Sequence, residues 1–213
     1  MSTVIAIDGP AASGKSSVAR QLAGKLGRLY VNTGNMYRGV TWAVLNAGFD
    51  LKESEAIAAY AKDLKLEFVD EGGHILMLVN GRSLTDEELN SEKVNGAVSL
   101  VAQVSDVRTR LVNEQRALLV RGDLVMEGRD IGSIVFPDSP FKFYIDASEE
   151  VRAARRSKQG LNDTVAMRDK LDSTRKTAPL IVPEGALRID SSDLSLDQVV
   201  ERVLEELRSR GAA

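Results

Sequence analysis

Residues 9–16 read Gly-Pro-Ala-Ala-Ser-Gly-Lys-Ser and match the pattern G-x-x-x-x-G-K-[ST] at every fixed position. A short, nearly all-apolar run over residues 3–8 precedes them, and a helical pattern over residues 16–26 follows. A strand before this pattern and a helix after it form the context in which it makes a phosphate-binding loop (P-loop). The chain is therefore predicted to fold as an α/β protein that binds a nucleotide through its phosphates.

The fixed positions of this loop have separate physical roles. Gly9 and Gly14 allow backbone conformations in which successive N–H groups point at phosphate oxygens, and the following helix adds its positive N-terminal end. Lys15 is predicted to neutralise the transferring phosphate, and the Ser16 hydroxyl to bind Mg²⁺. The residues predicted to bind ATP in this segment are Gly9, Pro10, Ala11, Ala12, Ser13, Gly14, Lys15, Ser16 and Ser17.

Short apolar strands alternate with helices along the rest of the chain. Strands are predicted at residues 29–31, 65–69, 75–79, 124–126, 141–145 and 186–189, and helices at 34–47, 53–64, 94–119 with a break near 105, after residue 148, and from a capping box at Ser195 and Gln198. This alternation is typical of a P-loop NTPase-type parallel sheet flanked by helices. We expect one domain over residues 1–213, with a small β-containing insertion at about 62–92 that ends its second strand with an Asn80-Gly81 turn.

Composition excludes several classes of protein. The chain has no cysteine, which removes disulfides, thiolate catalysis and cysteine-ligated metals. Its net charge of −3 argues against binding of a nucleic acid polymer, which needs a basic surplus. No apolar run approaches a membrane span, and the N-terminus does not resemble a secretory signal. We therefore expect a cytoplasmic protein that binds neither nucleic acid polymers nor membranes.

Positive charge is concentrated between residues 151 and 176. This window holds eight basic and three acidic side chains, a net charge of +5, so the rest of the chain carries −8. Arg152, Arg155 and Arg156 have helical i, i+3, i+4 spacing and therefore project from one face. One interpretation is a solvated basic face; the other is an arginine-rich lid, at about 156–168, that closes over phosphates. We favour the lid, because such a patch on an acidic protein suits a small anionic ligand.

Together these motifs resemble the bacterial cytidylate kinases, a family within the nucleoside monophosphate kinases. The resemblance runs nearly end to end. It is most specific in the following segments: residues 7–10 (Ile-Asp-Gly-Pro), 33–38 (Thr-Gly-Asn-Met-Tyr-Arg), 107–108 (Val-Arg), 127–132 (Glu-Gly-Arg-Asp-Ile-Gly), 135–138 (Val-Phe-Pro-Asp), the Arg155-Arg156 pair, and Arg168-Asp169 with Asp172, Arg175 and residues 178–180. The chain departs from the family pattern at Asn32, where an acid is usual, at Asn90, where an arginine is common, and in a shorter lid.

The resemblance implies roles for residues along the whole chain. Catalytic roles fall to Lys15, Arg129, Arg155, Arg156 and Arg175, with Arg152 and Arg156 closing over ATP. Arg38 and Arg129 would clamp the phosphate of CMP, and the insertion at 62–92 would lie on the CMP side. The remaining acceptor contacts would be Thr33 and Tyr37 beside Arg38, Ser99, Arg108 and Asp130 at the cytosine, Arg168 and Asp172 at the ribose, and Arg175 at the phosphates. Taken alone, Arg38 and Arg108 could be surface arginines, Ser99 a serine bonded to its own helix, and Tyr37 a packing residue.

The activity that this resemblance implies is Mg²⁺-dependent phosphoryl transfer from ATP to CMP or dCMP by a monomeric enzyme. Cytosine suits a carboxylate and an arginine as partners, because its amino group donates while its ring nitrogen and carbonyl oxygen accept. Two alternatives stay open from the residues alone. One is another small-acceptor P-loop kinase, acting on UMP, AMP or shikimate, and the other is a non-catalytic ATP-binding regulator.

Overall fold

The computed structural model describes residues 2–158 and 180–212. Its strands are β1 (Val4–Asp8), β2 (Leu29–Asn32), β3 (Leu66–Glu71), β4 (His74–Val79), β5 (Arg82–Ser83), β6 (Leu124–Gly128), β7 (Phe141–Asp146) and β8 (Leu187–Asp190). Its helices are α1 (Lys15–Leu26), α2 (Thr33–Asn46), α3 (Ser54–Asp63), α4 (Asp86–Leu89), α5 (Glu92–Val101), α6 (Ser105–Ala117), α7 (Glu149–Lys158) and α9 (Leu196–Ser209), with the short turns η1 (Leu118–Arg121) and η2 (Ile131–Val135). The α/β fold expected from the sequence is confirmed.

The strands join in one sheet in the order β3-β4-β2-β6-β1-β7-β8, with β5 added to β4. The strands from β4 to β8 along this order pair in parallel, whereas β3 and β5 pair with β4 in the antiparallel sense. Because β4 pairs in parallel with β2, the hairpin formed by β3 and β4 extends the main sheet. The predicted insertion at 62–92 is therefore continuous with the core sheet along one edge.

Helices cover both faces of the sheet, and successive side chains of β1 and β6 alternate between the two faces. Ile5, Ile7 and Val125 pack with residues of α1 and α9, whereas Ala6 and Met126 pack with the helices on the other face. Strands buried on both faces read as continuous apolar runs, which is the pattern seen in residues 3–8. None of the helices in these two described ranges is long and apolar enough to cross a membrane.

Local signals in the sequence account for several element ends. Asn80 and Gly81 have φ values of 52° and 76°, the left-handed pair that a tight hairpin turn between β4 and β5 requires. The Ser195 side chain accepts from Gln198 N and the Gln198 side chain accepts from Ser195 N, so the predicted capping box is confirmed. Asn32 caps α2 by accepting from Asn35 N at 3.1 Å.

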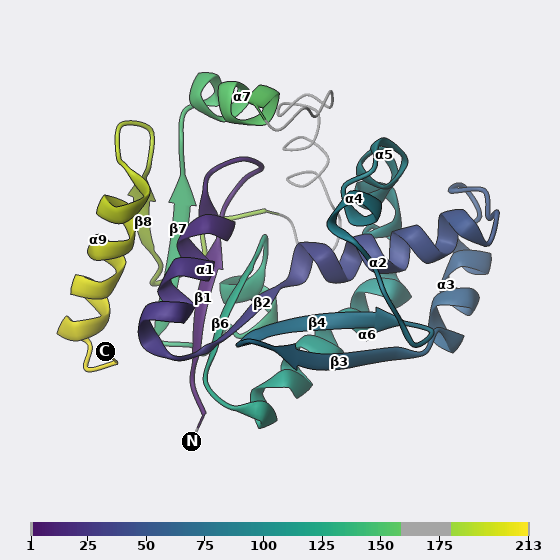
Figure 1. The fold of residues 1–213 in the computed structure, drawn as a ribbon, viewed down its shortest axis with the longest axis horizontal. Helices are drawn as coiled ribbons and strands as arrows, with labels where there is room; N and C mark the ends of the chain where they lie inside the picture. The colour runs from purple at the N-terminus through teal and green to yellow at the C-terminus, as the bar shows by residue number, and fades with distance from the viewer. Residues whose placement is uncertain (1, 159–179, 213) are drawn as a thin grey trace.

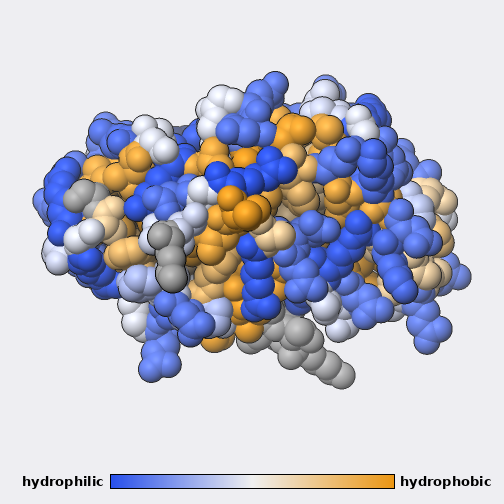
Figure 2. Space-filling view, turned by 90° about the horizontal axis from the view of Figure 1, so that it is seen from below, coloured by the Kyte–Doolittle hydropathy of each residue, from blue (hydrophilic) through white to orange (hydrophobic). Residues whose placement is uncertain are grey.

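The two ends of the sheet differ in character. In Figure 1 the chain termini lie at the lower end, and α7 lies above the carboxyl end of β7. Figure 2 views the lower end, where apolar residues gather near the middle of the face within a largely hydrophilic rim. The P-loop follows the carboxyl end of β1, so it lies at the opposite end of the strands. In open parallel sheets this is the end at which ligands bind.

Candidate active site

A cavity of about 1100 Å³ lies beyond the carboxyl ends of the central strands. This volume slightly exceeds the upper end, about 1,000 Å³, of the usual range for one small ligand. The cavity is lined by most of the predicted site residues that the structure describes: Ala11, Ala12, Ser13, Gly14, Lys15, Ser16, Ser17, Thr33, Tyr37, Arg38, Ser99, Arg108, Arg129, Asp130, Arg155 and Arg156. Residues that are far apart in the sequence are thus brought together around one hollow.

The P-loop wraps the first turn of α1 in the way its glycines allow. Gly14 precedes α1 with a φ of 90°, a left-handed conformation that favours glycine. A Cβ atom on Gly9 would overlap the carbonyl oxygen of Ile145 in the neighbouring strand β7, so a side chain is excluded there. Gly9 and Pro10 do not line the cavity, whereas the loop from Ala11 onward does. The backbone therefore approaches the cavity without intervening side chains, as a phosphate cradle requires.

Lys15, Ser16 and Glu127 meet between α1 and the end of β6. The Lys15 Nζ atom lies 3.3 Å from the carbonyl oxygen of Pro10 and 3.9 Å from Glu127 Oε2. The Ser16 hydroxyl donates to Glu127 Oε1 at 2.7 Å, and the Tyr30 hydroxyl lies 3.4 Å from the same oxygen. Burial, together with the charge of Glu127, raises the pKa of Tyr30, so this phenol stays protonated as a donor. The cluster places a cation, a hydroxyl and a carboxylate at one point of the cavity.

Arginines of α7 reach the P-loop from above. Arg155 donates to Ser13 O at 3.2 Å and to Ser191 Oγ and Ser191 O at 3.1 and 2.8 Å. Arg156 is buried and also lines the cavity. Arg152 is buried and does not line the cavity; its guanidinium donates to Ala147 O at 3.0 Å and to Ala11 O at 3.4 Å. The helix that bears these arginines is thereby tied to the nucleotide-binding loop.

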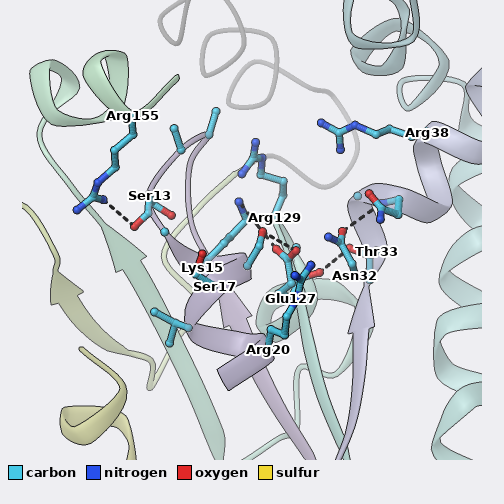
Figure 3. Close-up of a pocket in the computed structure, with 18 of the residues that line it drawn as sticks. Ser13, Lys15, Ser17, Arg20, Asn32, Thr33, Arg38, Glu127, Arg129 and Arg155 are labelled. Atoms are coloured by element: carbon cyan, nitrogen blue, oxygen red, sulfur yellow. Dashed lines mark hydrogen bonds and ion pairs between the residues drawn. The ribbon is translucent and has the colours of Figure 1, made fainter. Parts of the chain in front are cut away.

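The opposite side of the cavity is formed by α2 and α5. Arg38 projects from α2, and its Nη2 donates to Asn95 Oδ1 of α5 at 3.3 Å. The Thr33 hydroxyl donates to Glu127 O at 2.8 Å, which ties the start of α2 to β6. Tyr37 is buried, and its ring lies 5.1 Å from the guanidinium carbon of Arg108. Figure 3 shows Arg155 and Arg38 on opposite sides of the cavity, with Lys15 and Arg129 between them.

Arg108 and Asp130 form a buried ion pair at the back of this side. Each is 4% exposed, and Arg108 Nη1 lies 2.7 Å from Asp130 Oδ2. Arg108 Nε also donates to Ala102 O at 3.2 Å, so the guanidinium is held in one orientation. Arg108 is therefore not the solvated surface residue that a helical arginine could have been. Ser99 of α5 is equally buried and lines the same part of the cavity.

Arg129 lies between the two sides. Its Nη1 donates to the carbonyl oxygen of Gly9 at 2.5 Å, so the turn after β6 contacts the start of the P-loop. A cation in this position can reach a phosphate on either side of the cavity. The arrangement can hold two anionic ligands end to end, because cations occupy both sides and the middle.

The predicted residues Arg168, Asp172 and Arg175, and most of the predicted lid at 156–168, lie outside the described residues. Conversely, the structure adds functional candidates that the sequence prediction missed: Asp8, Glu127, Asn95 and Ser191. Glu127 stands at the end of an apolar strand, where open parallel sheets bind ligands, so the sequence carried a signal for it. Asp8 also ends an apolar strand, directly before the P-loop, so the same signal applies to it, whereas Asn95 and Ser191 have no sequence signal beyond their polarity.

Comparison with known proteins agrees with this geometry. Residues 5–209 match the family model described as cytidylate kinase. A cytidylate kinase of Geobacillus kaustophilus is 42% identical over 97% of this chain and 96% of its own length. A cytidylate kinase of Mycolicibacterium paratuberculosis is 43% identical over 97% of this chain and 96% of its own length. A sugar kinase structure from a Janibacter species, 15% identical over 98% of this chain and 95% of its own, has a TM-score of 0.51 and supports the fold alone. With a family match that covers nearly all of the chain and relatives of this identity, the chain belongs to the cytidylate kinase family.

Proposed function

We propose that this protein transfers the γ-phosphoryl group of ATP to CMP and dCMP, giving ADP with CDP or dCDP. The observation that carries the proposal is the buried Arg108–Asp130 pair, which faces the same cavity as the P-loop. A nucleotide-binding loop alone would suit an ATPase or a regulator. A second polar site, buried and preorganised in the same cavity, suits a kinase with a base-specific acceptor.

The donor half of the site is the P-loop with α7. Backbone N–H groups from Ala11 to Ser16 and the N-terminus of α1 would bind the phosphates of ATP. Lys15 would neutralise the charge that moves with the γ-phosphoryl group. Arg155 and Arg156, which line the cavity above the loop, would approach the phosphates from the other side.

Ser16 and Glu127 fit a magnesium site. Their oxygen atoms lie 2.7 Å apart at the cavity wall, and hydroxyl and carboxylate oxygens are ligands that Mg²⁺ prefers. No cluster of three or more His, Cys, Asp or Glu side chains that could hold a metal occurs in the described part of the chain. Ser16 and Glu127 would hold the ion, whose charge would offset that of the ATP phosphates.

The acceptor half of the site is formed by α2, α5, α6 and the turn after β6. Arg38 and Arg129 would bind the phosphate of CMP, because guanidinium groups can contact two phosphate oxygens at once. Asp130 would accept from the cytosine amino group while Arg108 donates to the ring nitrogen or the carbonyl oxygen. At two of these positions uracil has a hydrogen-bond donor where cytosine has an acceptor, or the reverse. UMP would therefore leave buried groups unpaired, which is a strong basis for discrimination between CMP and UMP.

The transfer itself needs little covalent help from the protein. The attacking phosphate oxygen of CMP is already anionic near neutral pH, so no general base is required. The chain must instead align two nucleotides and exclude water, which would otherwise accept the phosphoryl group. We assign Arg168 and Asp172 to the ribose, Arg175 to the phosphates and residues 156–168 to a lid. We further propose a monomeric single-domain enzyme in which residues 62–92 form the CMP-side insertion.

An acceptor panel at saturating MgATP tests this function. ADP release would be measured with CMP, dCMP, UMP, AMP and shikimate as acceptors. We expect CMP and dCMP to be the best acceptors, with little ADP formed in the absence of an acceptor. If no pyrimidine monophosphate is converted to its diphosphate, the proposed function is wrong. Acceptor-independent ADP release would instead indicate an ATPase.

A further inference from the structure

A buried carboxylate lies between the two halves of the site, and neither half requires it for the roles described above. Asp8 is the last residue of β1 and is fully buried. Its Oδ1 accepts from Ile131 N at 2.8 Å, and its Oδ2 accepts from Gly132 N at 2.7 Å. Ile131 and Gly132 open the short turn η2, so the carboxylate caps the start of that turn from a neighbouring strand.

Asp8 connects two segments that would bind different substrates. It immediately precedes Gly9, the first residue of the P-loop, and its two hydrogen-bond donors immediately follow Arg129 and Asp130. The same two segments meet a second time, where Arg129 Nη1 donates to Gly9 O at 2.5 Å. The turn that holds the acceptor-side residues is thereby fastened to the donor loop at two points.

The strand pairing alone does not account for these contacts. Asp8 already stands opposite Gly128 in the parallel register of β1 and β6, so the backbones of the strands are joined without its side chain. Burial raises the pKa of the Asp8 carboxyl to about 7, and the charge of Asp130 acts in the same direction. The hydrogen bonds from Gly132 and Ile131 and the charge of Lys15 oppose this rise. A buried carboxylate is therefore costly here and needs a role beyond strand pairing.

We propose that Asp8 is a positioning residue, which fixes the Arg129–Asp130 turn relative to the P-loop and so sets the distance between acceptor and donor. This inference rests on the proposed function, because it takes Arg129 and Asp130 as acceptor-binding residues. Its physical basis is that phosphoryl transfer depends on alignment, and that a displacement of about 1 Å can cost on the order of 100-fold in rate.

The test is the isosteric substitution Asp8→Asn. An amide offers one acceptor oxygen in place of two, so one of the two N–H groups loses its partner and the turn shifts. We expect kcat/KM for CMP to fall about 10- to 100-fold and the preference for CMP over UMP to narrow about tenfold. The affinity for ATP, measured in the absence of acceptor, should change less than about threefold, because α1 and the P-loop are retained.

Asp123→Asn is the matched control. Asp123 also accepts from a backbone N–H between β1 and β6, that of Thr3 at 2.6 Å, but at the other end of these strands. Loss of a carboxylate–backbone hydrogen bond between these strands occurs in both variants, whereas a positioning role predicts that the acceptor-specific loss occurs in Asp8→Asn alone. The inference is overturned if folded Asp8→Asn keeps its CMP preference, or if its ATP and CMP parameters fall by equal factors.

If Asp8→Asn does not fold, hydrogen exchange in the wild-type protein decides the question. We expect the Ile131 and Gly132 amides to be protected in the free enzyme and to gain at least about tenfold in protection when CMP binds. Unchanged exchange on CMP binding would overturn the inference. Failure of the proposed function is separate, because wild-type protein would then not phosphorylate CMP at all.

Discussion

The hydroxyl of Ser16 donates a 2.7 Å hydrogen bond to Glu127, which joins the first turn of α1 to the carboxyl end of β6. Glu127 is 2% exposed, and Lys15 Nζ lies 3.9 Å from its other oxygen. The carboxylate of Glu127 thus has a hydroxyl beside one oxygen and an ammonium group beside the other. The pair is therefore ready to share an ion with the phosphates that the P-loop would bind.

Replacing Glu127 by Gln should raise the magnesium requirement of the enzyme. The amide retains the size and a hydrogen bond to Ser16 but removes the negative charge that would attract the ion. We expect kcat to fall about 100-fold at a low Mg²⁺ concentration and to recover partly as Mg²⁺ is raised. Glu201→Gln on the exposed face of α9 removes the same charge away from the cavity and serves as control. A Mg²⁺ titration that superimposes on the wild-type curve would exclude this role.

Lys15→Met should abolish turnover while leaving the fold intact. Lys15 lies at the cavity wall, where its ammonium group would offset the charge on the transferring phosphate. We expect kcat to fall about 1000-fold, with the far-UV circular dichroism spectrum unchanged. Lys25→Met, at the exposed end of the same helix, should retain full activity. Near-normal turnover by Lys15→Met would rule out the mechanism.

Asp130→Ala should impair use of CMP far more than binding of ATP. The substitution removes the partner of buried Arg108, which costs about 3–5 kcal/mol of stability, so the variant must be assayed below its unfolding temperature. We expect kcat/KM for CMP to fall at least about 100-fold, with the KM for ATP changed only a few-fold. Adding Arg108→Met should restore stability without restoring CMP use. Equal losses for both nucleotides would contradict the assignment of this pair to the base.

Local sequence signals predicted much of the fold and of the donor site. The P-loop, the Asn80-Gly81 turn and the Ser195 capping box each depend on residues adjacent in the chain, so their chemistry can be recognised from short segments. Strand ends could also be predicted, because apolar runs stop where polar residues begin. Arg129 and Asp130, which the resemblance implied as site residues, follow such a strand end.

Contacts between distant segments could not be predicted in the same way. The Arg38–Asn95 and Asp8–Ile131 hydrogen bonds span 57 and 123 residues, and neither partner carries a motif that points to the other. The parallel pairing of β4 with β2 likewise depends on which sheet edge is available when the hairpin packs. Helical spacing likewise placed Arg152, Arg155 and Arg156 on one face but could not say how deeply each one lies, and Arg152 is 9% exposed.

The free energy of unfolding should fall as pH rises from about 4 to about 7, because Asp8 holds a proton in the folded state that it loses in the unfolded chain. Its pKa is raised from 3.8 to about 7, chiefly by burial, so in this range the folded state binds more protons than the unfolded chain. The free energy of unfolding therefore decreases with pH, by up to about 4 kcal/mol for this group. Urea denaturation at pH 5 and pH 8 should show this decrease in the wild type, and a smaller one in Asp8→Asn. Parallel pH dependence in the two proteins would contradict the assignment.

Asn95→Asp should weaken binding of CMP through competition for Arg38. Asn95 is buried, accepts from Arg38 Nη2 at 3.3 Å and donates to Asn90 O at 2.5 Å. A neutral amide orients the guanidinium yet leaves its charge available to a phosphate, whereas a carboxylate would pair with that charge. We expect the KM for CMP to rise about tenfold with the KM for ATP unchanged. Asn95→Ala, which loses the same hydrogen bonds without adding charge, separates the two effects. The charge argument requires the Asp variant to have the higher KM for CMP; equal values would show that the lost amide contacts, and not competition for Arg38, account for the change.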